Sequence, residues 1–528
     1  MINYAAHVAP TRVPQTEKLL GRNQVKNNAG GYVFEVDCWK RLDRFLTIGN
    51  EGGTYYVGEA KLTKENAECI LECADKDHKR AVNRVVELST SGRIPRNDTA
   101  VFALALLSSF SKSAPYALKH LNEVCRIGTH LFQFVEAVKS FRGWGRSLKN
   151  AVANWYLSKT PQDLSYQLVK YQQRNGWSHR DLIRLSHPKT DSCSLNDAFK
   201  WAVGKWDKVE VVDREDLSPI LGFEQSKKAD DKQQIISLIT DFNLPRECIP
   251  TKFLNDKEVW AALLEKMPMT AMIRNLGKMS NVGLLTQFSD AAGSICERLV
   301  DVDRLKKAYI HPLSVLLALK TYQSGHGFRG SLSWKVIPQI SDALNEAFYK
   351  AFTLVKPTNK RWVLGVDVSG SMGSLINNTN LSCAEVAAAL SMVTVRTEKN
   401  YCVWGFADKM RELNLNRSMS LEDVLSRTRR MNFGATDCAL PMITALKAKL
   451  PVDVFVVLTD SETWMTNVHP CIALREYRQK MSIPAKLVVM SMTGTDYTIA
   501  DPNDGGTLDI SGFDSSVPSV LRDFVGES

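Results

Sequence analysis

Along the first two thirds of the chain, apolar residues recur at the spacing of amphipathic helices. Segments of this kind run from about residue 15 to 355, separated by short polar or proline-containing turns. We expect helices at 61–73, 77–88, 98–110, 117–126, 131–141 and 147–158. Thr160 and Ser178 stand where helix N-caps are expected, each followed three residues later by an aspartate. Strand signals are scarce, and 53–57 is the clearest. Short amphipathic helices joined by short turns predict stacked helix pairs, an α-solenoid of HEAT-like repeats.

After residue 360 the pattern changes to apolar runs that alternate with helical segments. Runs typical of buried strands occupy 362–366, 401–406, 452–458 and 486–492. Helical segments occupy 383–397, 421–430, 438–450, 470–481 and 517–525. This alternation predicts a parallel sheet with helices on both faces. The polar segment 356–361 separates the two patterns, so we predict two domains, 1–360 and 361–528.

The composition is that of an ordinary globular protein, with 44% hydrophobic and 23% charged residues. A chain of 528 residues exceeds the size of one hydrophobic core, which supports the division into domains. No apolar run is long enough for a membrane helix, and the first residues lack the blocks of a signal peptide. We therefore expect a cytoplasmic protein that does not enter a membrane. The 11 cysteines show no CxxC pair and no zinc-like spacing, so we expect reduced thiols.

Positive charge is unevenly distributed along the chain. The formal net charge is +10, and residues 1–360 carry 51 basic and 38 acidic side chains, whereas 361–528 carry 16 and 19. Between residues 112 and 189 there are 13 basic and 4 acidic side chains. Such a local excess is the electrostatic footprint of a protein that binds nucleic acid, although any single lysine in it could be a solvated surface group.

Two stretches, 139–149 and 170–189, hold most of this local charge. Trp144 and Trp177 lie within them and either stack on RNA bases or pack in the fold, packing being the commoner role for a tryptophan at a helix end. The candidate RNA-binding residues are Lys119, Lys139, Arg142, Arg146, Lys149, Lys170, Arg174, Arg180, Arg184, His187 and Lys189.

The second stretch is expected to form two consecutive helices with basic faces. Lys170 and Arg174 are four residues apart, so we expect them to share one helix face. Arg180, Arg184 and His187 are expected to do the same on the next helix. The planar guanidinium groups match the oxygens of RNA phosphates. Together, the two helices would present one basic surface.

An aspartate and two serines stand at alternate positions directly after the first apolar run of the second domain. Asp367, Ser369 and Ser371 would lie at the carboxyl end of a strand, where open α/β sheets bind ligands. One carboxylate and neutral hydroxyl oxygens suit a hard cation such as Mg²⁺. Thr436 opens a later helical segment and Asp460 ends the next buried strand. Both are therefore expected at the same rim of the sheet, where the carboxyl ends of the strands lie.

These pieces, in this order, resemble the metal-ion-dependent adhesion site of von Willebrand factor A domains. The resemblance implies an α/β, Rossmann-like A domain at 361–528 with a divalent cation, expected to be Mg²⁺, as its cofactor. Alone, an Asp-x-Ser-x-Ser stretch would be a solvated turn. The sequence Phe433-Gly-Ala435-Thr436 departs from the usual pattern, because a second glycine is common before the threonine. Ala435 leaves the threonine hydroxyl in place but alters the loop.

Further motifs resemble the Ro 60 kDa autoantigen family, including its bacterial Rsr members. Segments 30–33, 39–44 and 51–56 resemble the opening of the TROVE module, and 176–188 resembles its basic core. Members of this family have a ring of HEAT-like helices closed by an A domain. They bind small non-coding Y RNAs on the outer surface, and single-stranded ends of misfolded RNAs pass through the central hole.

The resemblance implies an RNA-binding protein, a monomeric ring that acts in RNA quality control as a ribonucleoprotein. Its implied partners are a small non-coding Y-like RNA, misfolded RNA with single-stranded 3′ ends, and an exoribonuclease such as polynucleotide phosphorylase. It assigns RNA contacts to Lys170, Arg174 and His187, and it assigns the metal to the five rim residues named above.

Two other classes of function compete with RNA binding. A metal-dependent protein-adhesion or scaffold module is the alternative, because the metal site alone would favour it. An enzyme is the third class. The glycines between 30 and 58 are not followed by Lys-Ser/Thr at P-loop spacing, and no GxSxG elbow for a Ser-His-Asp triad occurs. The rim offers too few carboxylates for a two-metal nuclease. We therefore predict no catalytic activity.

Overall fold

The computed structural model describes residues 12–48, 59–94, 96–208, 215–327, 331–352, 356–375, 381–429, 434–511 and 517–526. The strand expected at 53–57, the motif at 51–56 and Phe433 lie outside these residues. Within them, no helix has both the length and the apolar character required to cross a bilayer.

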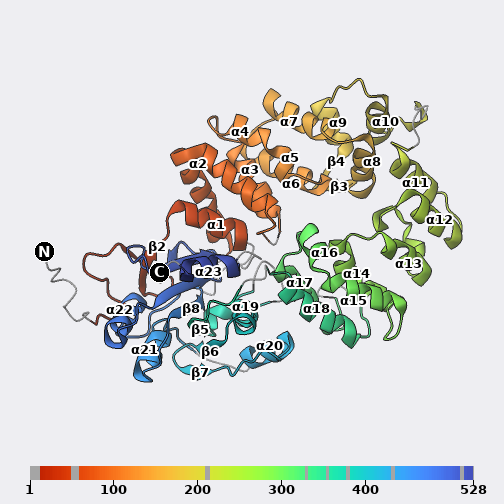
Figure 1. Ribbon diagram of the computed structural model, residues 1–528. Coiled ribbons are helices and arrows are strands. Elements are labelled where there is room, and N and C mark those ends of the chain that lie inside the picture. Colours follow the sequence, from red (N-terminus) through yellow and green to blue (C-terminus); the bar gives the residue numbers. More distant parts are fainter. Residues whose placement is uncertain are drawn as a thin grey trace.

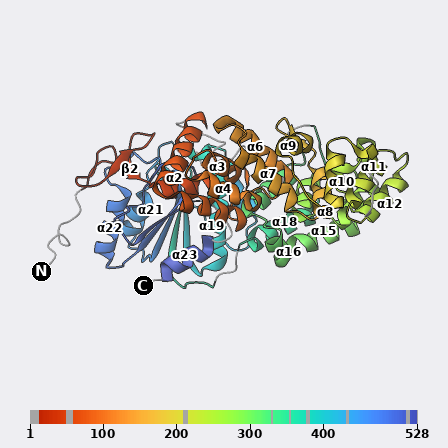
Figure 2. The same cartoon turned by 90° about the horizontal axis from the view of Figure 1, so that it is seen from above.

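An arc of short helices makes up the first part of the molecule, leaving the A domain at α1 and returning to it at α17 and α18 (Figure 1). Seen from above, the arc extends to one side of the A-domain sheet (Figure 2). The helices are α1 (Cys38–Ile48), α2 (Glu59–Thr90), α3 (Asp98–Leu107), α4 (Ala114–Lys119), α5 (Leu121–Val124), α6 (Gly128–Phe141), α7 (Arg146–Leu157), α8 (Pro161–Lys170), α9 (His179–Ser186), α10 (Cys193–Ala202), α11 (Ser218–Ser226), α12 (Lys232–Phe242), α13 (Lys257–Glu265), α14 (Met269–Asn281), α15 (Asp290–Val300), α16 (Val302–Lys307), α17 (Pro312–Gln323) and α18 (Pro338–Lys350).

The expected helix starts are confirmed. The Thr160 hydroxyl accepts a hydrogen bond from the Asp163 backbone N–H at 3.1 Å and caps α8. Ser178 and Asp181 form a reciprocal capping box at the start of α9. The helices expected at 61–73 and 77–88 are joined in α2, with a break in helical geometry at Asp77.

The prediction that Lys170 and Arg174 share a helix face is wrong. Helix α8 ends at Lys170, and Arg174 lies in the strand β3 (Gln173–Arg174), which pairs with β4 (Trp177–Ser178) in a hairpin. The turn of this hairpin contains Asn175 and Gly176, both with positive φ. Backbone with positive φ cannot continue an α-helix, so the chain turns here before α9 begins.

The A domain is a doubly wound α/β unit. Its sheet has the order β11-β9-β8-β5-β6-β7. The strands are β5 (Arg361–Asp367), β6 (Asn400–Phe406), β7 (Met410–Glu412), β8 (Val454–Thr459), β9 (Lys486–Ser491) and β11 (Thr507–Ser511). The helices are α19 (Cys383–Thr397), α20 (Leu421–Arg429), α21 (Leu440–Lys447), α22 (Pro470–Met481) and α23 (Val517–Gly526). A helical array followed by an α/β domain confirms the predicted fold class.

The sheet is mixed, whereas the sequence predicted a parallel one. Strand β7 runs antiparallel to β6 at the edge, and the other pairings in this sheet are parallel. Strand β7 has only three residues, half-buried or exposed, and therefore carries no apolar run that a sequence pattern could reveal. Strand β5 lies between β6 and β8, and Asp367 and Thr459 both lie at the carboxyl ends of these parallel strands.

A second, small sheet joins the two ends of the chain. It has the order β1-β2-β10, where β1 (Gln24–Lys26) and β2 (Tyr32–Glu35) come from the N-terminal segment and β10 (Tyr497–Thr498) comes from the A domain. Glu35 pairs with Tyr497, and Phe34 pairs with Thr498. Residues 12–36 therefore pack on the A domain although they precede the first helix of the arc.

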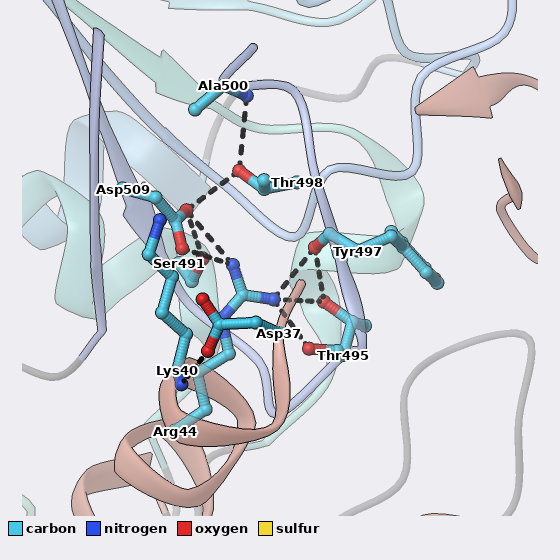
Figure 3. Close-up of polar contacts among 9 residues, drawn as sticks. All are labelled: Asp37, Lys40, Arg44, Ser491, Thr495, Tyr497, Thr498, Ala500 and Asp509. Carbon is cyan, nitrogen blue, oxygen red and sulfur yellow. Dashed lines mark hydrogen bonds and ion pairs between the residues drawn. The ribbon is translucent and has the colours of Figure 1, made fainter. Parts of the chain in front are cut away.

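The arc is fastened to the A domain at both of its ends. At the N-terminal seam, Nη2 of the buried Arg44 guanidinium donates to both carboxylate oxygens of Asp509, at 2.8 and 2.9 Å (Figure 3). It also donates to the backbone carbonyls of Thr495 and Tyr497. At the other end, Lys320 of α17 pairs with Glu385 of α19 at 2.8 Å. Loss of one partner from a buried pair such as Arg44–Asp509 costs about 3–5 kcal/mol, because the other charge stays buried.

Candidate functional site

Five exposed basic residues form what we call the basic face: Arg174, Arg180, Arg184, His187 and Lys189. They come from β3, from α9 and from the turn that follows it. His187 is not part of the helix but its C-cap, with a left-handed backbone (φ 48°). The three arginines make no ion pair with any described residue, so their guanidinium groups are available to an anionic ligand such as RNA phosphates.

The other candidate cations lie on neighbouring helices. Lys119, Lys139 and Arg146 are exposed on α4, α6 and α7, and Lys149 is half-buried on α7. Arg142 differs from them, because its guanidinium donates to the Ser108 carbonyl at 2.6 Å and thereby ties the end of α6 to the end of α3. A contact between RNA and any of these residues stays a prediction.

The two tryptophans of the basic segment pack together. The ring centroids of Trp144 and Trp177 are 6.0 Å apart, and the Trp177 indole donates to Glu136 at 2.7 Å. Both side chains are half-buried against the hydrophobic core. The structure therefore gives both rings a packing role, which was the alternative to base stacking.

Sequence reasoning missed a large cavity, about 640 Å³, between α14, α17 and the turn before α3. We call it the inner cavity. Its lining combines four basic residues with aromatic rings: Arg96, Arg246, Arg274, Lys278, Trp260, Tyr309 and Trp334. A Cβ atom on Gly92 would lie 2.8 Å from the Tyr309 ring, so the turns on either side of the cavity touch. No sequence signal could have found the cavity, because its residues are scattered over separate helices.

Lys170 lies beside the inner cavity rather than on the basic face. Its ammonium group donates to the Tyr166 hydroxyl at 2.9 Å, and it lines a smaller cavity of about 140 Å³. Arg246 and Asn275 line both cavities. Lys170 thus belongs with the cations that line these two neighbouring cavities.

The Asp-x-Ser-x-Ser turn folds around its own aspartate at the end of β5. One oxygen of Asp367 accepts from the Ser369 N–H at 3.0 Å, and the other accepts from the Thr459 hydroxyl at 2.6 Å. The hydroxyl oxygens of Ser369 and Ser371 are 3.1 Å apart. All four side chains are buried. Thr459 was not predicted as part of the site, since the pattern marks it only as the last residue of a strand.

Three buried carboxyl groups share this sheet edge: Asp367, Asp460 and Glu462. Burial raises the pKa of Asp367 to about 6. Burial, followed by the charges of Asp367 and Glu462, raises the pKa of Asp460 well above its ordinary value. Acids that raise each other's pKa are stabilised in their charged form by a cation placed between them.

We call Asp367, Ser369, Ser371, Thr436 and Asp460 the metal rim. Gly434 approaches the Asp-x-Ser-x-Ser turn, since its carbonyl would be 3.9 Å from a Cβ on Gly370, and this brings the loop of Thr436 to the turn. The buried Oδ2 of Asp460 has no hydrogen-bond partner among the described residues. An oxygen-only donor set with an unsatisfied buried carboxylate oxygen fits Mg²⁺.

The rim holds few formal charges. In the described ranges, no group of three or more His, Cys, Asp or Glu side chains is arranged to hold a metal ion. A cation at the rim would therefore depend on two carboxylates together with hydroxyl and water oxygens. Such a donor set is typical of weak Mg²⁺ binding with water still attached.

Comparisons with known proteins identify both halves of the chain. The TROVE domain model matches residues 25–244 and 243–324, and the Ro60 vWA domain model matches residues 361–525. The "RNA-binding protein RO60" of Deinococcus radiodurans is 38% identical over 99% of both chains. The "RNA-binding protein RO60" of Caenorhabditis elegans is 36% identical over 97% of this chain and 92% of its own length.

Among solved structures, the crystal structure of the Deinococcus radiodurans RO (RSR) protein is similar to this one with a TM-score of 0.70. The two are 36% identical, and the match covers 93% of this chain and 100% of that chain. Fold, domain order and sequence agree, and the chain belongs to the Ro60 family of proteins with a TROVE domain followed by a von Willebrand factor A domain.

Proposed function

We propose that this protein is a non-enzymatic RNA-binding protein that acts in RNA quality control as a ribonucleoprotein. The observation that carries the proposal is the full-length similarity to relatives named as RNA-binding proteins, in a chain whose basic face is exposed and forms no ion pair with the residues that the structure describes. Exposed arginines bind phosphates bidentately and give affinity without base specificity.

The two basic regions suit two forms of RNA. The basic face on α9 is exposed, so it suits the phosphates of a shaped, largely double-stranded RNA such as a small Y-like RNA. The inner cavity combines cations with aromatic rings, the combination that binds single strands by stacking and charge. We assign to it the single-stranded 3′ end of a misfolded RNA.

The metal rim would hold Mg²⁺ through Asp367, Ser369, Ser371, Thr436 and Asp460. When bound, the ion would supply an open coordination position for a carboxylate of a protein partner. Trp464 and Met465 follow the rim loop and are 36% and 47% exposed, which favours a second function in protein adhesion. An exoribonuclease such as polynucleotide phosphorylase is the partner that we propose, because it would degrade an RNA end held by the ring.

Fluorescence anisotropy with two labelled RNAs tests the proposal. A duplex with a single-stranded 3′ tail should bind several-fold more tightly than a blunt duplex of equal charge, because only the tail can enter the inner cavity. Arg274→Ala should remove this preference and leave the affinity for the blunt duplex unchanged. Equal affinities of the wild-type protein at physiological salt would contradict the assignment of the tail, and no binding of either RNA would contradict RNA binding itself.

A further inference from the structure

The loop that leaves the metal rim is held by the N-terminal segment of the chain. Directly after Asp460, Ser461 adopts a left-handed backbone (φ 63°), which is uncommon for a residue with a side chain. The side-chain amide of Asn27 donates to the carbonyls of Ser461 at 3.1 Å and Thr463 at 2.9 Å. Asn27 is itself fixed by Gly31, whose N–H donates to its side-chain oxygen at 2.7 Å. The path of the backbone after Asp460 thus depends on Asn27.

The middle residue of this loop, Glu462, is also held from the N-terminal segment. One of its oxygens accepts from the Asn28 side chain at 2.9 Å, and the other accepts from the Ala29 N–H at 3.0 Å. The Tyr497 hydroxyl donates to it as well. These bonds fix the third buried carboxylate at this end of the sheet.

Two further contacts show that the N-terminal segment packs closely against the rim loops. A Cβ atom on Gly31 would lie 1.9 Å from the Thr463 carbonyl, so only glycine fits at this position. The side-chain amide of Gln15 donates to Asp437, the neighbour of Thr436, at 2.8 Å, and its oxygen accepts from the Thr463 hydroxyl at 2.6 Å. Both loops that carry rim residues after β5 therefore touch the N-terminal segment.

The same segment runs directly into the N-terminal seam of the arc. Strand β2 pairs with β10, and α1 follows at once with Arg44 inserted among Thr495, Tyr497 and Asp509 (Figure 3). Tyr497 lies at both places, because its carbonyl binds Arg44 and its hydroxyl binds Glu462. The rim loop and the seam are thus two ends of one continuous set of hydrogen bonds.

We propose that binding of a divalent cation at the metal rim and closure of the N-terminal seam are energetically coupled, with Asn27 and Asn28 as positioning residues for the rim. The proposal rests on the metal site of the proposed function. A cation that binds Asp460 fixes the loop 460–463, and a fixed loop offers its N-terminal partners a preformed docking site. Coupling of this kind is reciprocal. If a bound cation favours docking of the N-terminal segment by a certain factor, loss of that docking must weaken cation binding by the same factor.

Calorimetric titration of Mn²⁺ and Mg²⁺ into the full chain tests the coupling. Asn28→Ala should weaken cation binding about fivefold and Asn27→Ala about tenfold, at the lower end of typical coupling free energies. Asn28 is exposed, so its variant should fold even if the buried Asn27→Ala variant does not. Asn23→Ala is the matched control, since Asn23 is exposed in the same segment and its side chain bonds to no described residue.

Hydrogen exchange with mass spectrometry gives the second readout. In the wild-type protein, the cation should slow exchange at 24–35 and in α1, while α8 and α9 stay unchanged. Asp460→Asn should abolish this protection. Cation binding without protection at the seam, together with unchanged affinity in both asparagine variants, would overturn the coupling and leave the metal site and RNA binding intact. No cation binding in the wild-type protein would overturn the coupling and the metal site, while RNA binding is measured separately.

Discussion

The basic face and the metal rim place opposite charges in opposite surroundings. The arginines of the basic face are exposed and form no ion pairs among the described residues, whereas the carboxylates of the rim are buried and hydrogen-bonded. An exposed cation contributes to binding one phosphate at a time, and its removal leaves the fold intact. A buried carboxylate acts together with its neighbours, so a single change there should be all-or-none.

Removal of Asp367 should have the largest effect. At Mg²⁺ concentrations of about 100 times Kd, a bound ion stabilises the folded chain by about 2.7 kcal/mol, and Asp367→Ala should reduce this to zero. Scanning calorimetry with and without Mg²⁺ measures the difference. Asp523→Ala removes an exposed carboxylate of the same domain and should leave the Mg²⁺ effect unchanged.

RNA binding by Asp367→Ala should equal that of the wild-type protein at millimolar Mg²⁺, because the basic face lies on distant helices. If the unmodified chain showed no Mg²⁺ effect, the rim would be a metal-free cluster of hydrogen-bonded acids. If Asp367→Ala abolished RNA binding while keeping its fold, the two regions could not be separate sites.

Removal of two arginines from the basic face should have a graded effect. Arg180→Ala combined with Arg184→Ala should weaken small-RNA binding roughly tenfold. The slope of log affinity against log salt should become shallower by roughly 0.9 for each phosphate that the variant no longer binds. Anisotropy titrations at several salt concentrations measure both quantities. Lys399→Ala with Lys447→Ala removes two exposed charges from the A domain and is the control for net charge.

Lys170 and Arg174 should separate the two RNA-binding regions. Arg174→Ala should weaken binding of blunt and tailed duplexes alike by a few-fold, whereas Lys170→Ala should weaken only the tailed duplex, since Lys170 lines the cavity beside Arg246. His187→Ser should act like Arg174→Ala, more weakly. If the Lys170 and Arg174 variants lost the same affinity for blunt and tailed duplexes, the two residues would belong to one RNA-binding region.

The last effect, on stability rather than on binding, concerns His179, which is buried beneath the basic face. Burial lowers its pKa to about 3, while the unfolded chain has the ordinary value of 6.5. Between these values only the unfolded state binds the proton, so stability falls as pH falls from 6.5 towards 3, by up to about 1.4 kcal/mol per pH unit. Urea unfolding at pH 6.5 and 5 measures this slope. It should be shallower in His179→Gln and unchanged in His187→Gln, which alters an exposed histidine.

The sequence was informative wherever one short stretch determined the structure. The Thr160 and Ser178 caps and the position of Asp367 at the end of β5 depend on a few consecutive residues, and all three are found where they were expected. Arg174 was placed wrongly because helical spacing says nothing about where a helix ends, and Asn175-Gly176 was the turn signal that decided it.

Other features had no signal that a pattern could carry. The inner cavity is built from residues of separate helices, and the bonds of Asn27 to Ser461 and Thr463 join positions 434 and 436 residues apart. An asparagine in a polar turn looks the same whether it faces water or a loop at the other end of the chain. Only the closure of the arc makes these residues neighbours.

The pairing of β2 with β10 has a consequence for how the protein is made. Arg44 leaves the ribosome 465 residues before its partner Asp509. At typical rates of synthesis, about 5–20 residues per second, this interval lasts from roughly 25 to 90 seconds. Throughout that time the nascent β1–β2 hairpin carries an unpaired edge strand, a surface prone to aggregation until the last strands of the A domain emerge. A segment that is translated early is therefore among the last to reach its native partners, and a chaperone that shields it would act at that stage.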